Sequence, residues 1–175
     1  MILKVARLGH PVLRLKAKPV NPAKIRTPDF QTLLRDMVET MREHDGVGIA
    51  APQVHVSLQV AAIQVDHNPR YRRAPKIPLV ILINLKIRPV ERGKSLDWEG
   101  CLSVEGLRGR VPRWKRVAVQ AYNAKGEPVS FKAAGFFARV IQHEWDHLQG
   151  KVFLDRMTDF STLTHLTEFS RYWAR

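Results

Sequence analysis

The middle of the chain constrains the fold most, because residues 58–132 repeat short runs of β-branched and other apolar residues. These runs are LQVAAIQV, LVILINLKI, RVAVQAYN and PVSFK, and Pro, Gly and Asn residues separate them. Runs with such boundaries are typical of β-strands joined by turns. Because the strands cluster instead of alternating with helices, the pattern predicts an α+β fold with antiparallel sheets.

Helical periodicity appears on both sides of the strand region. Residues 27–46 begin with Thr27 as a candidate N-cap and Pro28 at the first helical position. Residues 133–150 repeat apolar and histidine positions at helical spacing, and the last segment repeats Phe160, Leu163, Leu166, Phe169 and Trp173. The sequence therefore predicts an N-terminal helix, a helix after the strands and an amphipathic C-terminal helix.

Length and composition favour a single domain over residues 1–175. No apolar run reaches the ~20 residues that a membrane span needs, and the first residues lack the apolar core of a secretory signal. The single cysteine, Cys101, cannot form an internal disulfide, which fits a reducing compartment. We therefore expect a cytoplasmic monomer that does not enter a membrane.

The segment QHEWDHLQG holds the strongest chemical signal. His143 and His147 are four residues apart, so on a helix they share one face and can bind one metal ion. Glu144 would lie beside that ion, where a carboxylate can accept a proton from water. The alternative is a helix with two surface histidines and no metal.

Catalytic sites of this kind usually have three protein ligands, so one more is needed. Cys101 in EGCLSV offers a thiolate, and Gly100 before it gives close access to the backbone, although a lone cysteine can also be a small buried hydrophobe. A third stretch, GVGIAAPQ, has glycines that let a ligand come close to the backbone. That stretch could equally be a loop packed under a sheet.

Taken together, GVGIAAPQ, EGCLS and QHEWDHL resemble, in their order and spacing, the three signature motifs of the peptide deformylases. The similarity extends to LGHPVLRLKAKPV, GLRGRVPR and FLDRM, and so covers nearly the whole chain. The resemblance implies a metal-dependent hydrolase that removes the N-terminal formyl group from formyl-methionine of nascent polypeptides and releases formate. We accordingly expect antiparallel sheets packed around a central metal-binding helix.

The resemblance also implies roles for individual residues. It makes three residues the metal ligands: Cys101, His143 and His147. Glu144 becomes the general acid and base, and Gln53 and the backbone N–H of Leu102 become donors to the oxyanion. Glu99 and Arg113 are expected to form an ion pair that supports the cysteine segment.

Apolar side chains on the histidine face of the helix indicate a substrate pocket. Phe136 and Val140, with Val47 from the first motif, are expected to surround the methionine side chain. The expected substrate-binding set also includes Gly48, Ile49 and Gly100. Arg139 precedes His143 by one turn and could contact a substrate carbonyl or carboxylate, but we favour a stem on apolar surface with its charged head in water.

The ligand set does not select one ion, because a thiolate with two imidazoles suits Zn²⁺ and can also hold Fe²⁺. The family resemblance points to Fe²⁺ as the native metal, with Zn²⁺ or Ni²⁺ as substitutes. Two other functions stay open: a zinc metallopeptidase that cuts internal amide bonds, and a basic RNA-binding module with a structural metal.

The net charge of +13 comes from 29 Lys and Arg against 16 Asp and Glu. Because a formylated nascent peptide emerges at the ribosome, this charge suits docking on ribosomal RNA. A solvated surface that aids solubility would have the same composition.

Overall fold

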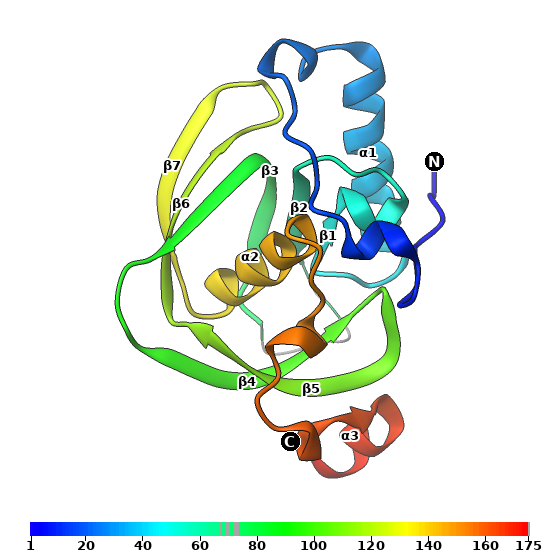
Figure 1. Ribbon diagram of the computed structural model, residues 1–175, viewed down its shortest axis with the longest axis vertical. Helices are drawn as coiled ribbons and strands as arrows, with labels where there is room; N and C mark the ends of the chain where they lie inside the picture. The colour runs from blue at the N-terminus through cyan, green and yellow to red at the C-terminus, as the bar shows by residue number, and fades with distance from the viewer. Residues whose placement is uncertain (67, 69–70, 72–73, 175) are drawn as a thin grey trace.

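The computed structural model describes residues 1–174 except for residues 67, 69–70 and 72–73. In this part of the chain a five-stranded sheet has the order β1 (Gly48–Ala50), β2 (Val60–Val65), β3 (Ile77–Pro89), β6 (Arg116–Tyr122) and β7 (Pro128–Ala134). A three-stranded sheet has the order β4 (Lys94–Cys101), β5 (Val104–Trp114) and β8 (Thr164–His165). The strands within each sheet pair antiparallel, which confirms the predicted α+β class (Figure 1).

Helix α1 (Pro28–Glu43) begins where the sequence predicted. Pro28 fixes the backbone of the first turn, but the Thr27 hydroxyl donates to the Lys24 carbonyl (2.8 Å) and does not cap the helix. The buried face of α1 packs on Ile49 and neighbouring sheet residues. The GVGIAAPQ stretch therefore forms strand β1 and a 3-10 helix rather than an irregular loop.

Helix α2 (Gly135–Leu148) runs through the middle of the molecule, between the five-stranded sheet and the β4–β5 hairpin (Figure 1). Ile141 and Leu148 are fully buried and belong to the same core cluster as Leu82 and Val119 of the sheet. Burial of each such side chain stabilises the fold by about 2 kcal/mol. This apolar side of α2 fixes the direction of its opposite, polar side.

The β4–β5 hairpin occupies the stretch between the apolar runs LVILINLKI and RVAVQAYN. Its register pairs Glu99 with Gly109 and Ser95 with Arg113. Polar residues interrupt the apolar alternation of both strands, because the side of the hairpin that faces α2 surrounds polar groups. Strand prediction from alternating apolar and polar residues does not detect a hairpin whose inner side is polar.

The C-terminal helix is much shorter than predicted. Instead of one helix the chain forms three elements: the 3-10 helix Phe160–Thr162, strand β8 and helix α3 (Leu166–Tyr172). The Asp159 side chain accepts from the Ser161 N–H (2.8 Å), and β8 pairs with β5 at Arg108. Because tertiary pairing outweighs local periodicity in short segments, the apolar spacing gave the wrong extent.

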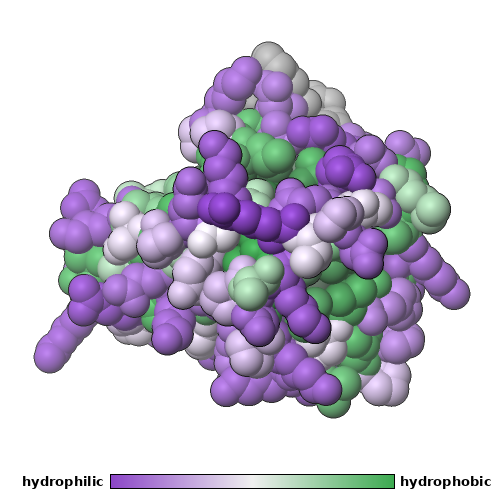
Figure 2. Space-filling view, turned by 90° about the horizontal axis from the view of Figure 1, so that it is seen from above, coloured by the Kyte–Doolittle hydropathy of each residue, from purple (hydrophilic) through white to green (hydrophobic). Residues whose placement is uncertain are grey.

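Hydrophilic side chains cover most of the end of the molecule shown in Figure 2, with smaller hydrophobic areas between them. Within the described ranges, the helices are too short or too polar to cross a bilayer. Three large apolar side chains near the C-terminus are more than half exposed: Phe160, Tyr172 and Trp173.

Candidate active site

Helix α2 carries two of the predicted ligands on its polar side. His143 and His147 are buried one turn apart, with ring centroids 5.0 Å from each other. Because the sheet holds the apolar side of α2, the two imidazoles face the β4–β5 hairpin, where they contact Glu99 and Cys101.

Cys101, the last residue of β4, meets the histidines from the hairpin. Its Sγ atom lies 3.2 Å from Nε2 of His147, and the ligand atoms of all three residues lie within 4.8 Å of one another. Burial alone would raise the pKa of the Cys101 thiol, but the imidazoles of His147 and His143 lower it well below its ordinary value. A thiolate beside two imidazoles is the donor set of a metal site with one open position.

The hydrogen bonds of His143 agree with a metal-binding role. Its Nδ1 atom lies 2.9 Å from Oε2 of Glu99, which leaves Nε2 available as a ligand. The residues present therefore fit one divalent ion held by Cys101, His143 and His147.

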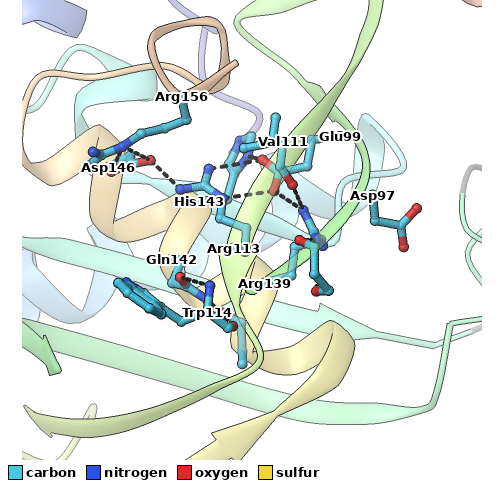
Figure 3. A network of polar contacts seen from close by, with 12 residues as sticks. Asp97, Glu99, Val111, Arg113, Trp114, Arg139, Gln142, His143, Asp146 and Arg156 are labelled. Carbon is cyan, nitrogen blue, oxygen red and sulfur yellow. Dashed lines mark hydrogen bonds and ion pairs between the residues drawn. The ribbon is translucent and has the colours of Figure 1, made fainter. Parts of the chain in front are cut away.

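Two buried arginines hold Glu99 in place (Figure 3). Arg113 donates from Nε (2.9 Å) and Nη2 (3.0 Å), and Arg139 donates from Nη1 (2.8 Å). Burial raises the pKa of the Glu99 carboxyl, but attraction to Arg113 and the bond with His143 outweigh this and keep the pKa well below its ordinary value. The expected Glu99–Arg113 ion pair is thus present, and it adjoins a metal ligand.

The expectation for Arg139, a charged head in water, was wrong. Its side chain is 5% exposed, and its guanidinium also donates to the carbonyls of Val111 (2.8 Å) and Ser95 (2.7 Å). The β4–β5 hairpin covers this part of α2 and supplies those acceptors. Arg139 borders the cleft beside the ligands, but four hydrogen bonds to Glu99, Val111 and Ser95 already engage it.

Asp146, whose role the sequence left open, extends the same network away from the ligands (Figure 3). It forms ion pairs with Arg113 and with Arg156, which stands in the 3-10 helix after α2. Burial raises the pKa of Asp146, but the bonds from Arg156 and the charge of Arg113 lower it below its ordinary value. Neither arginine contact of Asp146 has a local sequence signal, since the partners come from β5 and from the 3-10 helix after α2.

Glu144 is buried beside the ligands, and its Oε2 atom has no hydrogen-bond partner within the part of the chain that the structure describes. Burial raises the pKa of Glu144 to about 7. Only glycine fits opposite it, because a Cβ atom at position 48 would overlap the carboxylate. A carboxyl group that titrates near neutral pH can both accept and donate a proton.

The side-chain amide N–H of Gln53 also lies beside the ligand group. Its Oε1 atom accepts from the Ala50 N–H (2.8 Å), so its Nε2 atom faces Cys101 Sγ (3.5 Å) and Ser103 Oγ (3.2 Å). Leu102 follows the thiolate directly and also lines the cleft. A side-chain amide and a backbone segment therefore border the ligand group, as oxyanion donors would.

The cleft is lined by most of the predicted substrate-binding residues: Val47, Gly48, Gly100, Phe136, Arg139 and Val140. Ile49 differs, because its side chain is fully buried in the core beside α1. Successive side chains of a strand point to opposite faces, which explains the separation of Ile49 from Gly48. Tyr71 and Trp98 also line the cleft, and the sequence did not predict them because neither belongs to a recognised motif or a helical pattern.

The fold and the site together define a class of protein. A buried helix and a hairpin bring a thiolate and two imidazoles together, and a carboxyl group with a raised pKa lines the cleft beside them. These are the parts of a metal-dependent hydrolase.

Comparison with known proteins narrows the class to one family. The family model for polypeptide deformylase matches residues 2–162. Peptide deformylase 1 of Nitrosomonas europaea is 43% identical over 159 residues, which cover 91% of this chain and 89% of that protein. Peptide deformylase 2 of Ralstonia nicotianae is 44% identical over 161 residues, covering 92% and 90%. The chain belongs to the peptide deformylase family.

A solved structure agrees with this membership. The Met-Ala-Ser-bound class I type b peptide deformylase of Acinetobacter baumannii matches with a TM-score of 0.87 and 40% identity, covering 90% of this chain and 99% of that one. The chain is therefore an enzyme of the class that removes the N-terminal formyl group from nascent peptides, as its three motifs implied.

Proposed function

We propose that this chain releases formate from formyl-methionyl peptides in the cleft beside Cys101, His143 and His147. One observation carries the proposal: the buried Glu144 carboxyl group, whose Oε2 atom has no hydrogen-bond partner among the described residues, lies beside the Cys101, His143 and His147 group. Hydrolysis of an amide needs this pairing of a metal site with a proton carrier.

The three ligands are proposed to hold Fe²⁺, with Zn²⁺ or Ni²⁺ as substitutes. One thiolate and two imidazoles form a borderline-soft donor set that accepts all three ions. When bound, the ion supplies Lewis acidity, which lowers the pKa of a water molecule toward neutrality. Metal analysis of protein prepared without oxygen tests this identity, and stoichiometric zinc in fully active enzyme would overturn the iron assignment.

Glu144 is proposed to move the proton. As water attacks the formyl carbon, Oε2 of Glu144 accepts a proton from that water. The same atom then donates the proton to the methionine nitrogen, the C–N bond breaks, and formate and a free amine leave. A pKa near 7 suits both transfers, because it balances the two protonation states at working pH.

Gln53 and the Leu102 N–H are proposed to bind the negative charge that develops on the formyl oxygen. The Ala50 N–H holds the Gln53 amide oxygen, so the amide nitrogen needs no rearrangement during the reaction. We expect Gln53→Ala to lower kcat on the order of 10²-fold. Gln59→Ala, which removes an amide that donates to the Ala17 carbonyl, is the matched control and should retain full activity.

The methionine side chain is proposed to lie among Val47, Phe136 and Val140, with Gly48 and Gly100 allowing the substrate backbone close access. The Acinetobacter enzyme was crystallised with Met-Ala-Ser, and we propose that this chain binds the same kind of product. Val140→Arg should abolish the preference for methionine over alanine at the formylated position. Unchanged selectivity in a folded variant would remove Val140 from the pocket.

Formate release from formyl-Met-Ala-Ser by Fe²⁺-loaded protein, handled without oxygen, is the direct test of the function. Unformylated Met-Ala-Ser is the matched control substrate. Rapid formate release with no cleavage of the control supports deformylation, whereas cleavage of internal amide bonds would support the metallopeptidase alternative. No formate from folded, metal-loaded protein would contradict the proposal and favour a structural metal.

We further propose that the enzyme works in the cytoplasm as a monomeric single domain, and that it docks on ribosomal RNA through the outer face of the five-stranded sheet. Arg88 and Lys132 flank Ala118 in one row across β3, β6 and β7, and Lys86 and Arg116 are exposed beside them. This basic sheet face suits a phosphate backbone.

Co-sedimentation with ribosomes over a range of salt concentrations tests the docking. The double variant Arg88→Glu and Lys132→Glu should weaken binding and reduce the slope of affinity against salt by about two counterions. Lys151→Glu, an exposed charge reversal elsewhere in the chain, is the control. Binding that is equal in both variants, or that does not weaken in high salt, would argue against this face. Size-exclusion chromatography with light scattering tests the monomeric state.

A further inference from the structure

Aromatic rings join helix α3 to the edge of the cleft. The Phe169 ring lies edge-on to Trp98, with centroids 5.0 Å apart, and Trp173 lies 5.6 Å from the same indole. Trp98 is also a lining residue of the cleft. One indole therefore contacts the C-terminal helix and borders the substrate site.

A second route leads from Phe169 to the cleft through Arg108. The Arg108 guanidinium lies over the Phe169 ring (4.9 Å) and over the Tyr71 ring (4.7 Å). Tyr71 in turn lies 5.3 Å from Phe136, and both of these rings line the cleft. Phe169 therefore contacts Trp98 directly and is linked to Tyr71 through the Arg108 guanidinium.

Helix α3 is separate from the catalytic residues both in sequence and in space. The match to the family model ends at residue 162, whereas α3 spans Leu166–Tyr172. Strand β8 attaches it to β5 at Leu107 and Arg108, and α3 lies at the outer side of the β4–β5 hairpin (Figure 1). The metal ligands and Glu144 are on the opposite, inner side of that hairpin.

We infer that α3 is a positioning element for the part of the peptide that follows the formyl-methionine, and that Phe169 acts by holding Trp98 at the cleft edge. The inference rests on the proposed function. With the formyl group near Gln53 and the methionine side chain near Val140, we place the following residues along the aromatic edge that Trp98 and Tyr71 form. A fixed aromatic ring binds such a segment without the entropy cost of ordering the ring.

Phe169→Ala tests the inference with two substrates. For formyl-Met-Ala-Ser we expect kcat/KM to fall about 3- to 10-fold, the effect of one aromatic contact, through a higher KM and an unchanged kcat. For formyl-methionine amide, which has no residue after the methionine, both constants should stay unchanged. Phe169→Tyr, which keeps the ring, should restore the wild-type KM.

Tyr172→Ala is the matched control, because Tyr172 is an exposed aromatic residue of the same helix and takes part in none of the ring contacts among the described residues. A second readout needs no catalysis: calorimetry should show 3- to 10-fold weaker binding of Met-Ala-Ser to Phe169→Ala and unchanged binding of methionine amide. If Phe169→Ala does not fold, Phe169→Leu removes the ring and retains most of the apolar volume.

Equal changes for the short and the long substrate, or no change for either, would overturn the inference and leave α3 a purely structural element. Absence of formate release by the wild-type enzyme would contradict the proposed function instead. In that case the two product-binding measurements would still decide whether α3 positions a peptide.

Discussion

Replacement of Arg139 by Met tests whether the buried network supports the metal site. The substitution keeps the unbranched stem of the side chain and removes the guanidinium. Four hydrogen bonds disappear: Glu99 Oε1 (2.8 Å), the Val111 carbonyl (2.8 Å), the Ser95 carbonyl (2.7 Å) and Ser95 Oγ (3.2 Å). Glu99 retains Arg113 and His143 as partners, so its charge is not left isolated.

The loss of folding stability in Arg139→Met is large because both partners of the broken ion pair are buried. The Arg139 and Glu99 side chains are each 5% exposed. Breaking a buried pair by removing one partner costs about 3–5 kcal/mol, and the remaining partners of Glu99 place this case at about 3 kcal/mol. For a chain of this length the melting temperature should then fall by about 6–12 °C. Metal affinity should fall about 10- to 100-fold, because Glu99 orients His143.

The contribution of Glu99 to the stability of the fold depends on pH, and the sign of this dependence follows from its lowered pKa. Burial raises the pKa of Glu99, but attraction to Arg113 and the bond with His143 hold it well below the ordinary carboxyl value. A carboxylate whose pKa is lowered in the folded state contributes stability above its unfolded pKa and loses it as the pH falls. Arg113 and His143 remain in Arg139→Met, so both proteins should keep the contribution of Glu99 above about pH 5 and lose it in more acidic solution.

Thermal melting of the metal-free proteins and competition with a metal chelator measure the two effects separately. Arg171→Met is the control, because Arg171 is exposed and its ion pair with Glu168, at 3.4 Å, lies at the surface. The control should change stability by less than about 0.5 kcal/mol. A melting temperature within about 1 °C of wild type together with unchanged metal affinity in Arg139→Met would refute the argument.

Three further predictions concern the catalytic groups. Glu144→Gln should retain stoichiometric metal and lose on the order of 10²- to 10⁴-fold in kcat, and near-normal turnover of the metal-loaded variant would exclude the proton-carrier role. Gly48→Ala should lower kcat at least about 10-fold, because its Cβ overlaps the Glu144 carboxylate, whereas Gly93→Ala meets only the flexible Lys115 side chain and should be neutral in the same assay. Metal removal by a chelator should lower the melting temperature by about 5–10 °C when the ion was present at about 100 times its Kd. Cys101→Ser should show little of this response, and an equal response would exclude the thiolate as a ligand.

The sequence predicted those parts of the site whose signals are local. His143 and His147 share a helix face at a fixed spacing, so an amphipathic pattern was enough to place them together. Arg139 stands on the same helix, yet its burial depends on Glu99 and Ser95, which lie 40 and 44 residues earlier in a hairpin. A long charged side chain in an exposed-looking position gives no sign of partners at that separation.

The predicted extent of the C-terminal helix was wrong for a related reason. Phe160 and Leu163 fit helical spacing, but the chain there gains more from pairing with the free edge of β5 than from one more helical turn. Tyr71 and Trp98 were missed because the cleft edge is assembled from β4 and from a stretch between strands. Residues that act together only through tertiary structure leave no periodic signal.

Strand β4 carries residues of the metal site and also the residue that contacts helix α3. Glu99 and Cys101 are two residues apart and serve the metal site, whereas Trp98 contacts α3 on the outer side. The direct contact of α3 with the cleft edge therefore passes through β4. The Glu99–Arg113 ion pair clamps β4 to β5 on the inner side, so loosening Trp98 should leave Cys101 in place. This clamp is the reason that the loss of Phe169 is expected to change KM for longer peptides while kcat stays constant.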